Sequence, residues 1–511
     1  MPAKVIGLSA VVAEVSSRRR EGQRIALVHG SFDGEASVDR HLMRSLRACA
    51  DLVVVAVAER GHAGESFALT HRERAWLAAG IAEADLVAMV EGPSAAPTIA
   101  DVEPDLYAFS SMAFGDGPTS DELDALAAIG AELYTLSRRG DTLVEWRQRA
   151  VPGTRERQRF AAELRTQFGM GHVNAGLAAI RKLRVACIGE TIIDEYAYCD
   201  AIGKSGKEPM IVNRFLSCDA QAGGVLAVAN HLADFCAGVE VVSALGAIDR
   251  REEFVKSGLR PEVVPTFTTK HGAPTIVKRR YIDAYSRAKM MGVYHMDTAP
   301  LRGTDEEEFV AALENVLSRS DVAIVADYGH GLLTPRAVEV LARWNGFLAV
   351  NTQLNAANSG YHVLSKYPRA DYACLHEGEL RMDARDLHSA LPDLLEKTAS
   401  RMGAQAMMAT LGRKGTMMYA DGGRIVNCPA LASVVVERVG AGDAVLAISA
   451  VATAVGLPPE LTSLLGNLAG AQMVAVMGNS SSIRKPRLVE SVRHLLTEPV
   501  AEQRRIASEG G

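Results

Sequence analysis

The stretch that decides the fold reads Val434-Val-Val-Glu-Arg-Val-Gly-Ala-Gly-Asp443, and the apolar run 444–456 follows it. This pattern predicts a β-branched strand, then a turn of small residues, then a helix. Gly440, Ala441 and Gly442 have almost no side chains, so their backbone N–H groups can converge on a ligand. Those groups lie at a helix N-terminus, where the helix dipole favours negative charge. The turn is therefore a candidate anion site.

Asp443 places a carboxylate directly beside this turn. A carboxylate there repels a phosphate, unless its task is to accept the proton of the hydroxyl that attacks the phosphate. The combination indicates phosphoryl transfer to an alcohol. The alternative is a glycine turn in which Asp443 only caps the helix, which is a common arrangement. The turn alone does not separate the two interpretations.

Length and composition limit the remaining possibilities. The chain has 511 residues, so two or three domains are expected. Its net charge of −6 gives no general attraction to nucleic acid or to an anionic membrane. No apolar run approaches the ~20 residues that span a bilayer, and the apolar stretch 5–15 is interrupted by Glu14, which favours an amphipathic helix over a signal peptide. The seven scattered cysteines predict buried, reduced thiols and a cytoplasmic enzyme.

Residues 25–136 alternate buried strands with helices, which predicts a small α/β domain with a parallel sheet. This region resembles the nucleotidyltransferase family that includes the cytidylyltransferases. Gly30-Ser31-Phe32-Asp33 matches the G-x-F-D with which that family opens, and Pro104-Asp105-Leu106 matches the P-D-x that begins one of its strands.

The nucleotidyltransferase resemblance fails where the chemistry of that family lies. Its H-x-G-H turn binds nucleotide phosphates, whereas the corresponding stretch here reads Ala36-Ser37-Val38-Asp39. An acidic side chain would repel a triphosphate. Residues 1–137 are therefore expected to form a nucleotidyltransferase-like domain that has lost catalysis. His29 and His41 flank the turn, and a surface or capping role is expected for each.

Residues 138–182 are rich in arginine, with a break at Pro152-Gly153 and helical spacing from about 155 to 168. A charged linker helix explains this composition at least as well as a phosphate-binding patch does. The boundary between the domains is expected here, so that a second domain spans residues 183–511.

The second domain is predicted to hold a doubly wound parallel sheet. Its expected strands are 184–189, 322–327, 347–351, 372–375 and 406–411. Asp194 follows the first strand, at the edge where open α/β sheets bind ligands. Residues 202–216 and 275–296 are rich in Val, Tyr, Thr and Arg and are interpreted as antiparallel lid strands.

That order resembles the ribokinase-like (PfkB) carbohydrate kinases over residues 183–500. Asp327-Tyr-Gly-His-Gly331 is similar to the D-Y-G-K-G loop in the kinase half of the bifunctional heptose-phosphate kinase/adenylyltransferases. The nucleotidyltransferase-like domain is the second half of that resemblance, here placed first instead of last. The expected fold class is α/β, with an N-terminal nucleotidyltransferase-like parallel-sheet domain and a C-terminal ribokinase-like doubly wound α/β domain that carries a small β lid.

The resemblance implies a role for each candidate site residue. Asp443 would be the general base, and the anion hole would be formed by Gly440, Ala441 and Gly442. The residues that would face the sugar hydroxyls are Asp194, Gly223 and Gly224. The ATP site would be bordered by Thr410, Gly412 and Gly415 and closed by the helix around Asn467. Glu379, in His376-Glu-Gly-Glu379, would help to hold Mg²⁺ through water.

Two of these assignments have simpler alternatives. Gly223 and Gly224 can serve only to pack a helix close to a sheet, and Glu379 can be a solvated helix residue. The chain also departs from the D-T-x-G-A-G-D of the family, since it has Glu437-Arg438 in place of the first two residues. His376 replaces the Asn of N-x-x-E, and Ala227 stands where a sugar-contacting Asn often lies. These departures suggest an altered acceptor site with weakened nucleotide binding.

The leading hypothesis is an ATP- and Mg²⁺-dependent kinase that acts on a sugar or a sugar phosphate, for an activated sugar destined for a glycan or a secondary metabolite. Arg279, Arg280 and Arg287 could bind an acceptor phosphate, and exposed lid charges are the equally favoured alternative. Lid strands with exposed edges could also pair two subunits into a homodimer. The rival hypothesis is a non-catalytic nucleotide- or sugar-binding protein in which both domains are degenerate.

Overall fold

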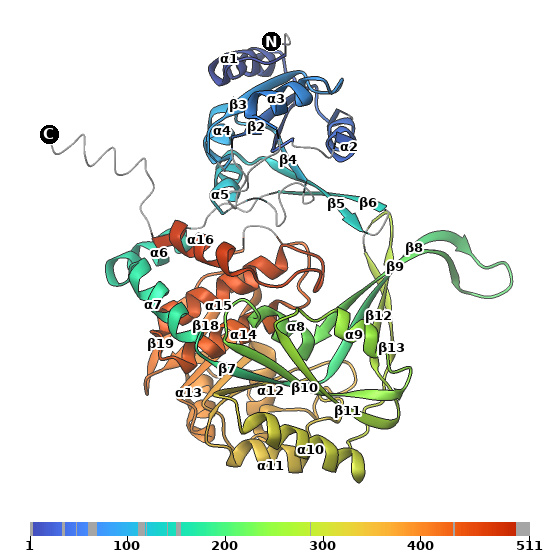
Figure 1. Ribbon diagram of the computed structural model, residues 1–511, viewed down its shortest axis with the longest axis vertical. Coiled ribbons are helices and arrows are strands. Elements are labelled where there is room, and N and C mark those ends of the chain that lie inside the picture. Colours follow the sequence, from blue (N-terminus) through green and yellow to red (C-terminus); the bar gives the residue numbers. More distant parts are fainter. Residues whose placement is uncertain are drawn as a thin grey trace. The chain divides into compact units, whose positions relative to one another are not determined.

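The computed structural model describes residues 4–32, 36–47, 49–59, 69–92, 94–110, 118, 120–139, 142–149, 155–286, 288–432 and 435–496. The chain divides into two compact units, Met1–Gln158 and Arg159–Gly511 (Figure 1). Among the described residues, no helix is both long enough and apolar enough to cross a membrane.

The N-terminal unit contains a six-stranded sheet in the order β3-β2-β1-β4-β5-β6. The first five strands run parallel, and β6 is antiparallel to β5. Strands β1 and β2 are buried along their whole length, and β2 is a continuous apolar run because both of its faces are covered. The strands are β1 (Ile25–Gly30), β2 (Leu52–Ala58), β3 (Leu86–Val90), β4 (Leu106–Ser110), β5 (Glu132–Arg139) and β6 (Thr142–Arg149). The helices are α1 (Leu8–Arg20), α2 (Ala36–Arg47), α3 (His71–Ala79), α4 (Ala96–Val102) and α5 (Ser120–Ile129).

Two local expectations for this region are wrong. The stretch 36–39, expected as a loop, is the first turn of α2. Residues 142–149, expected in a charged linker, form strand β6 instead, which pairs with β5 along its whole length. The helical part of the expected linker consists of α6 (Arg155–Gln167) and α7 (Met170–Ile180). The proposed domain limits of 137 and 183 stay a prediction.

The C-terminal unit is organised around a nine-stranded sheet in the order β11-β10-β7-β14-β15-β16-β17-β18-β19. All neighbouring pairs from β11 to β17 are parallel, and β18 and β19 add an antiparallel end. Helices cover both faces, so the sheet has an apolar core on each side (Figure 1). The expected doubly wound architecture is confirmed.

The elements of this sheet follow one another along the chain. Its strands are β7 (Arg184–Gly189), β10 (Gly238–Ile248), β11 (Val263–Pro274), β14 (Val322–Asp327), β15 (Phe347–Thr352), β16 (Tyr372–His376), β17 (Ala406–Thr410), β18 (Thr416–Ala420) and β19 (Arg424–Cys428). The helices are α8 (Val225–Leu232), α9 (Glu252–Ser257), α10 (Thr304–Leu317), α11 (Pro335–Arg343), α12 (Glu377–Ala384), α13 (Leu391–Met402), α14 (Ala441–Ala454), α15 (Pro459–Val474) and α16 (Lys485–Leu496).

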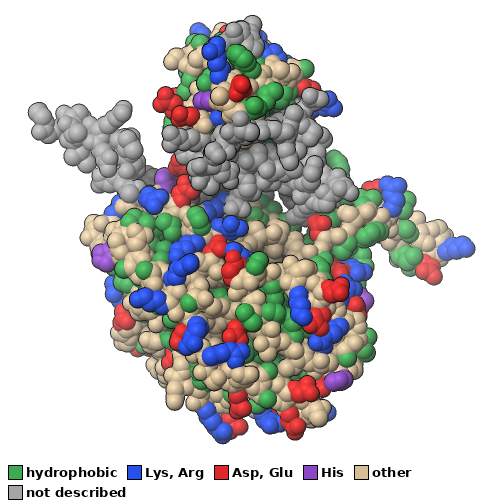
Figure 2. All heavy atoms as spheres, viewed as in Figure 1, with side chains coloured by type: hydrophobic (Ala, Val, Ile, Leu, Met, Phe, Trp, Pro, Cys, Tyr) green, Lys and Arg blue, Asp and Glu red, His purple; other side chains and the backbone are tan. Residues whose placement is uncertain are grey.

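A second sheet of four strands forms the lid, in the order β13-β12-β8-β9. Its strands are β8 (Thr191–Lys204), β9 (Ile211–Gly224), β12 (Ile276–Asp283) and β13 (Lys289–His295). The lid is not wholly antiparallel as expected, because β12 runs parallel to β8. The β8–β9 hairpin is buried at its base and exposed towards its tip, and Figure 2 shows hydrophobic side chains gathered along it.

The strand expected immediately before the anion turn is absent from the described residues, where 435–440 form a loop. This segment belongs to none of the three sheets. Its N–H groups bond to a helix end instead. The backbone N–H groups of Val436 and Glu437 both donate to the carbonyl of Val474, the last residue of α15, at 2.7 and 3.2 Å.

Candidate active site

The anion turn lies at the start of α14. Gly440 has a φ of +84°, and a Cβ there would lie 2.2 Å from Oδ1 of Asn479, so only glycine fits. The backbone N–H groups of Gly442 and Asp443 have no hydrogen-bond partner among the described residues, as expected for the first turn of a helix. The space beside the Cα atom of Gly442 is open. The turn therefore presents unpaired donors to an open space, which is the geometry that an anion requires.

Asp443 is 6% exposed and lies in the first turn of α14. Its Oδ1 accepts hydrogen bonds from the hydroxyl of Tyr328 at 2.9 Å and from Nε2 of Gln353 at 2.8 Å. Burial raises the pKa of Asp443 to about 7, against the lowering effect of the Tyr328 hydrogen bond. Among the described residues it accepts no bond from the backbone of its own helix. The geometry favours a poised carboxyl over a helix cap.

Tyr328 belongs to the loop 327–331, which follows β14 and is fixed by buried carboxylates. The two oxygens of Glu190 accept the backbone N–H groups of Tyr328 at 2.9 Å and of His330 at 2.8 Å. Burial raises the pKa of Glu190, and these two hydrogen bonds oppose that rise. The side chains of Asn355 and Asn358 donate to the carbonyl of Tyr328. The loop therefore has little freedom to move.

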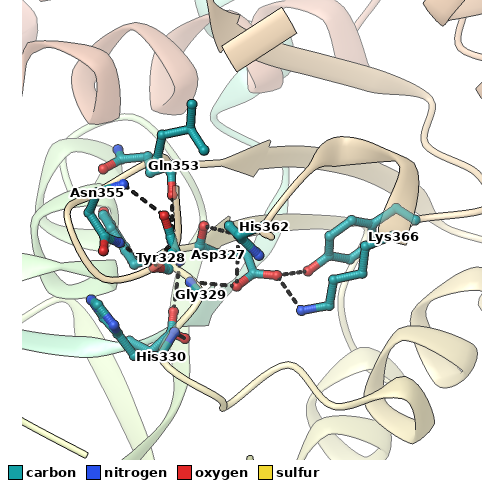
Figure 3. Close-up of polar contacts among 12 residues, drawn as sticks. Asp327, Tyr328, Gly329, His330, Gln353, Asn355, His362 and Lys366 are labelled. Atoms are coloured by element: carbon teal, nitrogen blue, oxygen red, sulfur yellow. Dashed lines mark hydrogen bonds and ion pairs between the residues drawn. The ribbon is translucent and has the colours of Figure 1, made fainter. Parts of the chain in front are cut away.

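Asp327 anchors the same loop from the other side (Figure 3). Its carboxylate accepts from the backbone N–H of Gly329 at 3.0 Å, from the hydroxyl of Tyr367 at 2.6 Å and from Nζ of Lys366 at 2.7 Å. Gly329 has a φ of +70°, which suits glycine at this tight turn. The ion pair between Asp327 and Lys366 therefore helps to position this loop.

Asp194 and Gly223 lie on the lid strands β8 and β9. Oδ1 of Asp194 accepts a hydrogen bond from Arg280 at 2.5 Å, and Oδ2 accepts a longer one from Nδ2 of Asn479 at 3.4 Å. A Cβ at Gly223 would lie 2.1 Å from Oδ2 of Asp194, so glycine here makes room for that carboxylate. Gly224 has a φ of +59°, and its Cβ would lie 2.4 Å from the carbonyl of Glu190, which gives it a packing role.

Lys278 is a site residue that the motifs did not reveal. It is 7% exposed, and its Nζ lies 5.8 Å from the ring centroids of both Tyr294 and Tyr328. Burial lowers the pKa of Lys278, and the charge of Asp194 is the largest of the effects that oppose this. Among the described residues its ammonium group has no hydrogen bond or ion pair. Since side chains alternate along a strand, Lys278 and Arg280 share one face of β12.

The other two lid arginines do not join this face. Nε of Arg279 donates to Oε2 of Glu195 at 2.6 Å, on the opposite face of β12, and Arg287 lies outside the described residues. His330, next to Tyr328 in the loop, is 2% exposed, and neither of its ring nitrogens has a partner among the described residues. Burial and the nearby charge of Lys278 lower the pKa of His330 to about 4, so its imidazole is neutral at pH 7.

A model of the pfkB family of carbohydrate kinases matches residues 182–486. The chain belongs to this family. Curated relatives named Bifunctional protein HldE, from Koribacter versatilis and Trichlorobacter lovleyi, are 28% and 27% identical to it over 58% of this chain. The chain covers 60% and 61% of the length of these relatives. Phosphofructokinase-2 from Escherichia coli, crystallised with potassium, superposes with a TM-score of 0.50 at 15% identity, covering 62% of this chain and 100% of that one.

Within this pfkB site, Glu379 sits at the start of α12. Its Oε1 accepts the backbone N–H of Leu354 at 3.0 Å, and its Oε2 accepts that of His376 at 2.8 Å. Burial raises its pKa. No group of three His, Cys, Asp or Glu side chains in the described residues could cage a metal ion. Because Mg²⁺ usually keeps several waters and binds through one or two carboxylates and substrate phosphates, Glu379 still fits as the acceptor of a bound water.

The residues assigned to the ATP border have structural contacts of their own. Oγ1 of Thr410 donates weakly to the carbonyl of Leu375 at 3.4 Å. Gly412 and Gly415 have φ values of +58° and +93°, and a Cβ at Gly415 would lie 2.0 Å from the carbonyl of Cys428. Oδ1 of Asn467 accepts the backbone N–H of Leu431 at 3.0 Å. Their nucleotide contacts stay a prediction.

Proposed function

We propose that the protein is an ATP- and Mg²⁺-dependent kinase that phosphorylates a hydroxyl of a sugar phosphate similar to a heptose phosphate. The observation that carries this proposal is the position of Asp443, a buried carboxyl with a pKa raised to about 7, at the turn where the N–H groups of Gly442 and Asp443 have no partner among the described residues. A general base works best when its pKa lies near the working pH. Glu379 would hold Mg²⁺ through water, and the ion would supply positive charge to the phosphates.

The turn and Asp443 divide the work between them. Gly440, Ala441 and Gly442 would bind the transferred phosphoryl group through their backbone N–H groups, as helix N-termini bind phosphates. The N–H of Ala441 also donates weakly to the carbonyl of Arg438, at 3.5 Å. Asp443 would accept the proton of the acceptor hydroxyl. Asp194 lies on the lid strand β8. It would fix a neighbouring hydroxyl of the sugar.

The unpaired cation in the site favours a phosphorylated acceptor. Arg280 already has a carboxylate partner in Asp194, so its charge is compensated. Lys278 is buried without such a partner in the described part of the chain, and a buried ammonium group is costly until an anion neutralises it. A phosphate on the acceptor would supply that anion, with Arg280 as a second donor.

We further propose that the kinase works in the cytoplasm, in the synthesis of an activated sugar for a glycan or a secondary metabolite, and that the N-terminal unit is a nucleotidyltransferase-like domain without catalytic activity. None of the seven cysteines forms a disulfide, which suits a reducing compartment.

The test is an ATP-consumption screen of the full chain against sugars and sugar phosphates, including heptose and hexose phosphates. Asp443→Asn is the matched control for contaminating kinases. Turnover by the wild type that this variant loses supports the proposal. ATP binding without any acceptor that raises ATP consumption would instead favour the non-catalytic nucleotide- or sugar-binding protein.

A further inference from the structure

The two oxygens of the Asp443 carboxylate differ in their surroundings. Oδ1 accepts two hydrogen bonds, from the hydroxyl of Tyr328 and from Nε2 of Gln353. Oδ2 has no hydrogen-bond partner among the described residues. A carboxylate whose one oxygen is already occupied by two donors presents the other oxygen to an incoming hydroxyl in a single orientation.

Both donor residues, Tyr328 and Gln353, are held in place by hydrogen bonds to their own backbone groups. The backbone N–H of Tyr328 donates to Oε2 of Glu190, and its carbonyl accepts from Nδ2 of Asn358. The backbone N–H of Gln353 donates to the carbonyl of Asp327 at 2.9 Å, and its carbonyl accepts from Nδ2 of Asn358 at 3.0 Å. In Figure 3 Gln353 and Asn355 lie on one side of Asp327 and Lys366 on the other. Glu190, Asn358 and the backbone carbonyl of Asp327 therefore fix both groups that contact Asp443.

Other charged and titratable groups also face Asp443. Lys278 on β12 and Asp194 on β8 act on it through space with opposite signs, and Cys374 lies close to it on β16. Tyr328 contacts both Asp443 and Lys278: its hydroxyl donates to Asp443, and its ring lies beneath Nζ of Lys278. None of these three groups forms a hydrogen bond with Asp443, so among the described residues only Tyr328 and Gln353 fix the orientation of its carboxylate.

We propose that Tyr328 and Gln353 are positioning residues that hold Oδ1 of Asp443 and so make Oδ2 the atom that accepts the acceptor proton; this rests on the proposed kinase function. In that step the acceptor O–H bond breaks and its proton goes to Oδ2. The electron pair of the acceptor oxygen forms a bond to the γ-phosphorus of ATP, while the pair of the broken P–O bond leaves with ADP.

The proposal predicts a change in pH dependence and not only a loss of rate. A donor to the carboxylate favours its charged form, so removal of the donor raises the pKa of Asp443. Tyr328→Phe should move the acid limb of the kcat profile of the full chain to higher pH by about one unit. It should therefore lose about tenfold in kcat at pH 6 and much less at pH 9. Gln353→Met should move the limb in the same direction, and the double variant further than either.

The matched control is Tyr372→Phe. Tyr372 is as deeply buried as Tyr328, and its hydroxyl donates to Oγ of Ser449 on the same helix α14 at 2.7 Å, but it does not contact Asp443. Its loss should lower stability without moving the kcat profile. If Tyr328→Phe and Gln353→Met keep the wild-type acid limb, or lose kcat equally at all pH values as a packing defect would, the proposal is overturned.

A second measurement needs no activity and so separates this proposal from the kinase assignment. The folded pKa of Asp443 lies above its unfolded value, so its stabilising contribution is present at low pH and is lost as the pH rises through about 7. Without the Tyr328 donor this loss should be larger. The urea midpoint of Tyr328→Phe should therefore fall further below that of the wild type at pH 9 than at pH 5. The urea midpoint of Tyr372→Phe should fall below that of the wild type by the same amount at the two pH values. If the deficit in urea midpoint of Tyr328→Phe is the same at pH 5 and pH 9, as for Tyr372→Phe, the positioning role is overturned. A wild type that phosphorylates no acceptor would overturn only the kinase assignment.

Discussion

Nζ of Lys289, on the lid strand β13, lies 2.7 Å from Oε2 of Glu437, three residues before Gly440 of the anion turn. Oε1 of Glu437 accepts the backbone N–H groups of Arg438 at 2.8 Å and of Val439 at 3.3 Å. The same carboxylate therefore folds the loop that leads into the turn and ties this loop to the lid. The lid and the nucleotide side of the site are linked through one ion pair.

Lys289→Met should raise the KM for ATP several-fold and leave kcat at saturation nearly unchanged. The pair itself adds only ~0.2–1 kcal/mol, because Lys289 is 42% exposed, so global stability should change little. Glu437→Gln should have a similar effect, and the double variant should be no worse than either single one. Arg214→Met is the control, since it breaks an exposed ion pair with Asp200 in the same lid. Additive losses for Lys289 and Glu437 would show that the pair does not act as a unit.

The unpaired ammonium group of Lys278 leads to a prediction about substrate choice. Lys278→Met should raise the KM for a phosphorylated acceptor at least tenfold, since a charge-assisted contact is lost. The KM for the corresponding free sugar should change little. Arg279→Met is the matched control, because its partner Glu195 lies on the opposite face of β12. Equal losses with both acceptors would place the acceptor phosphate elsewhere.

The exposed apolar side chains of the lid predict self-association. Ile211 and Phe215 on the edge strand β9 are 72% and 61% exposed. An apolar edge strand tends to pair with another strand or surface. Sedimentation at micromolar concentration should show a dimer that Phe215→Glu dissociates, whereas Leu387→Glu, on an exposed site outside the lid, should not. A wild-type monomer would count against the dimer but not against the fold.

The N-terminal unit should release no pyrophosphate from ATP or CTP with any sugar 1-phosphate. Ala36 and Asp39 stand where the resembled family has histidines, and both lie in the first turn of α2. The assay uses the full chain with Asp443→Asn, so that the kinase site cannot consume the nucleotide. Robust pyrophosphate release by that variant would show that this unit retains catalysis.

The sequence contained enough information for the sheet of the second unit and for the turn at 440–443, because both rest on local patterns. Apolar runs fix the strands, and small residues before a helix fix the anion turn. The strand expected before the turn is wrong for a reason that no local pattern contains: the partner of Val436 is the end of α15, nearly forty residues later. Strand β6 was hidden because arginines dominate the composition of its region.

In the candidate site too, local patterns reveal some residues, and contacts between distant segments decide the rest. Lys278 could have been found, because it alternates with Arg280 on a predicted strand. Tyr328 and His330 were visible in the quoted loop, but nothing in that loop tells which atom the tyrosine reaches. Gln353 and Asn479 belong to no motif, and packing between distant segments alone brings them to Asp443 and Asp194.

Asp443 carries the assignment, so its replacement is the decisive prediction. Asp443→Asn should leave folding and ATP binding nearly intact, because Asn has almost the same shape and the N–H groups of the turn are untouched. It should lower kcat by roughly 10²–10⁴-fold, the usual contribution of a positioned base. The wild type loses stability as the pH rises through about 7, whereas Asn cannot ionise, so this variant should lack that loss.

Gly442→Val separates the anion turn from the base. The space beside Gly442 is open in the protein itself, so the valine side chain should be tolerated in the fold. That space is where the transferred phosphoryl group would lie, so the variant should raise the KM for ATP and lower kcat together. Asp443→Asn should lower kcat alone. If Asp443→Asn instead keeps near-normal turnover on the identified acceptor, then the carboxylate is only part of the buried network around Tyr328 and Gln353, and another group must accept the proton.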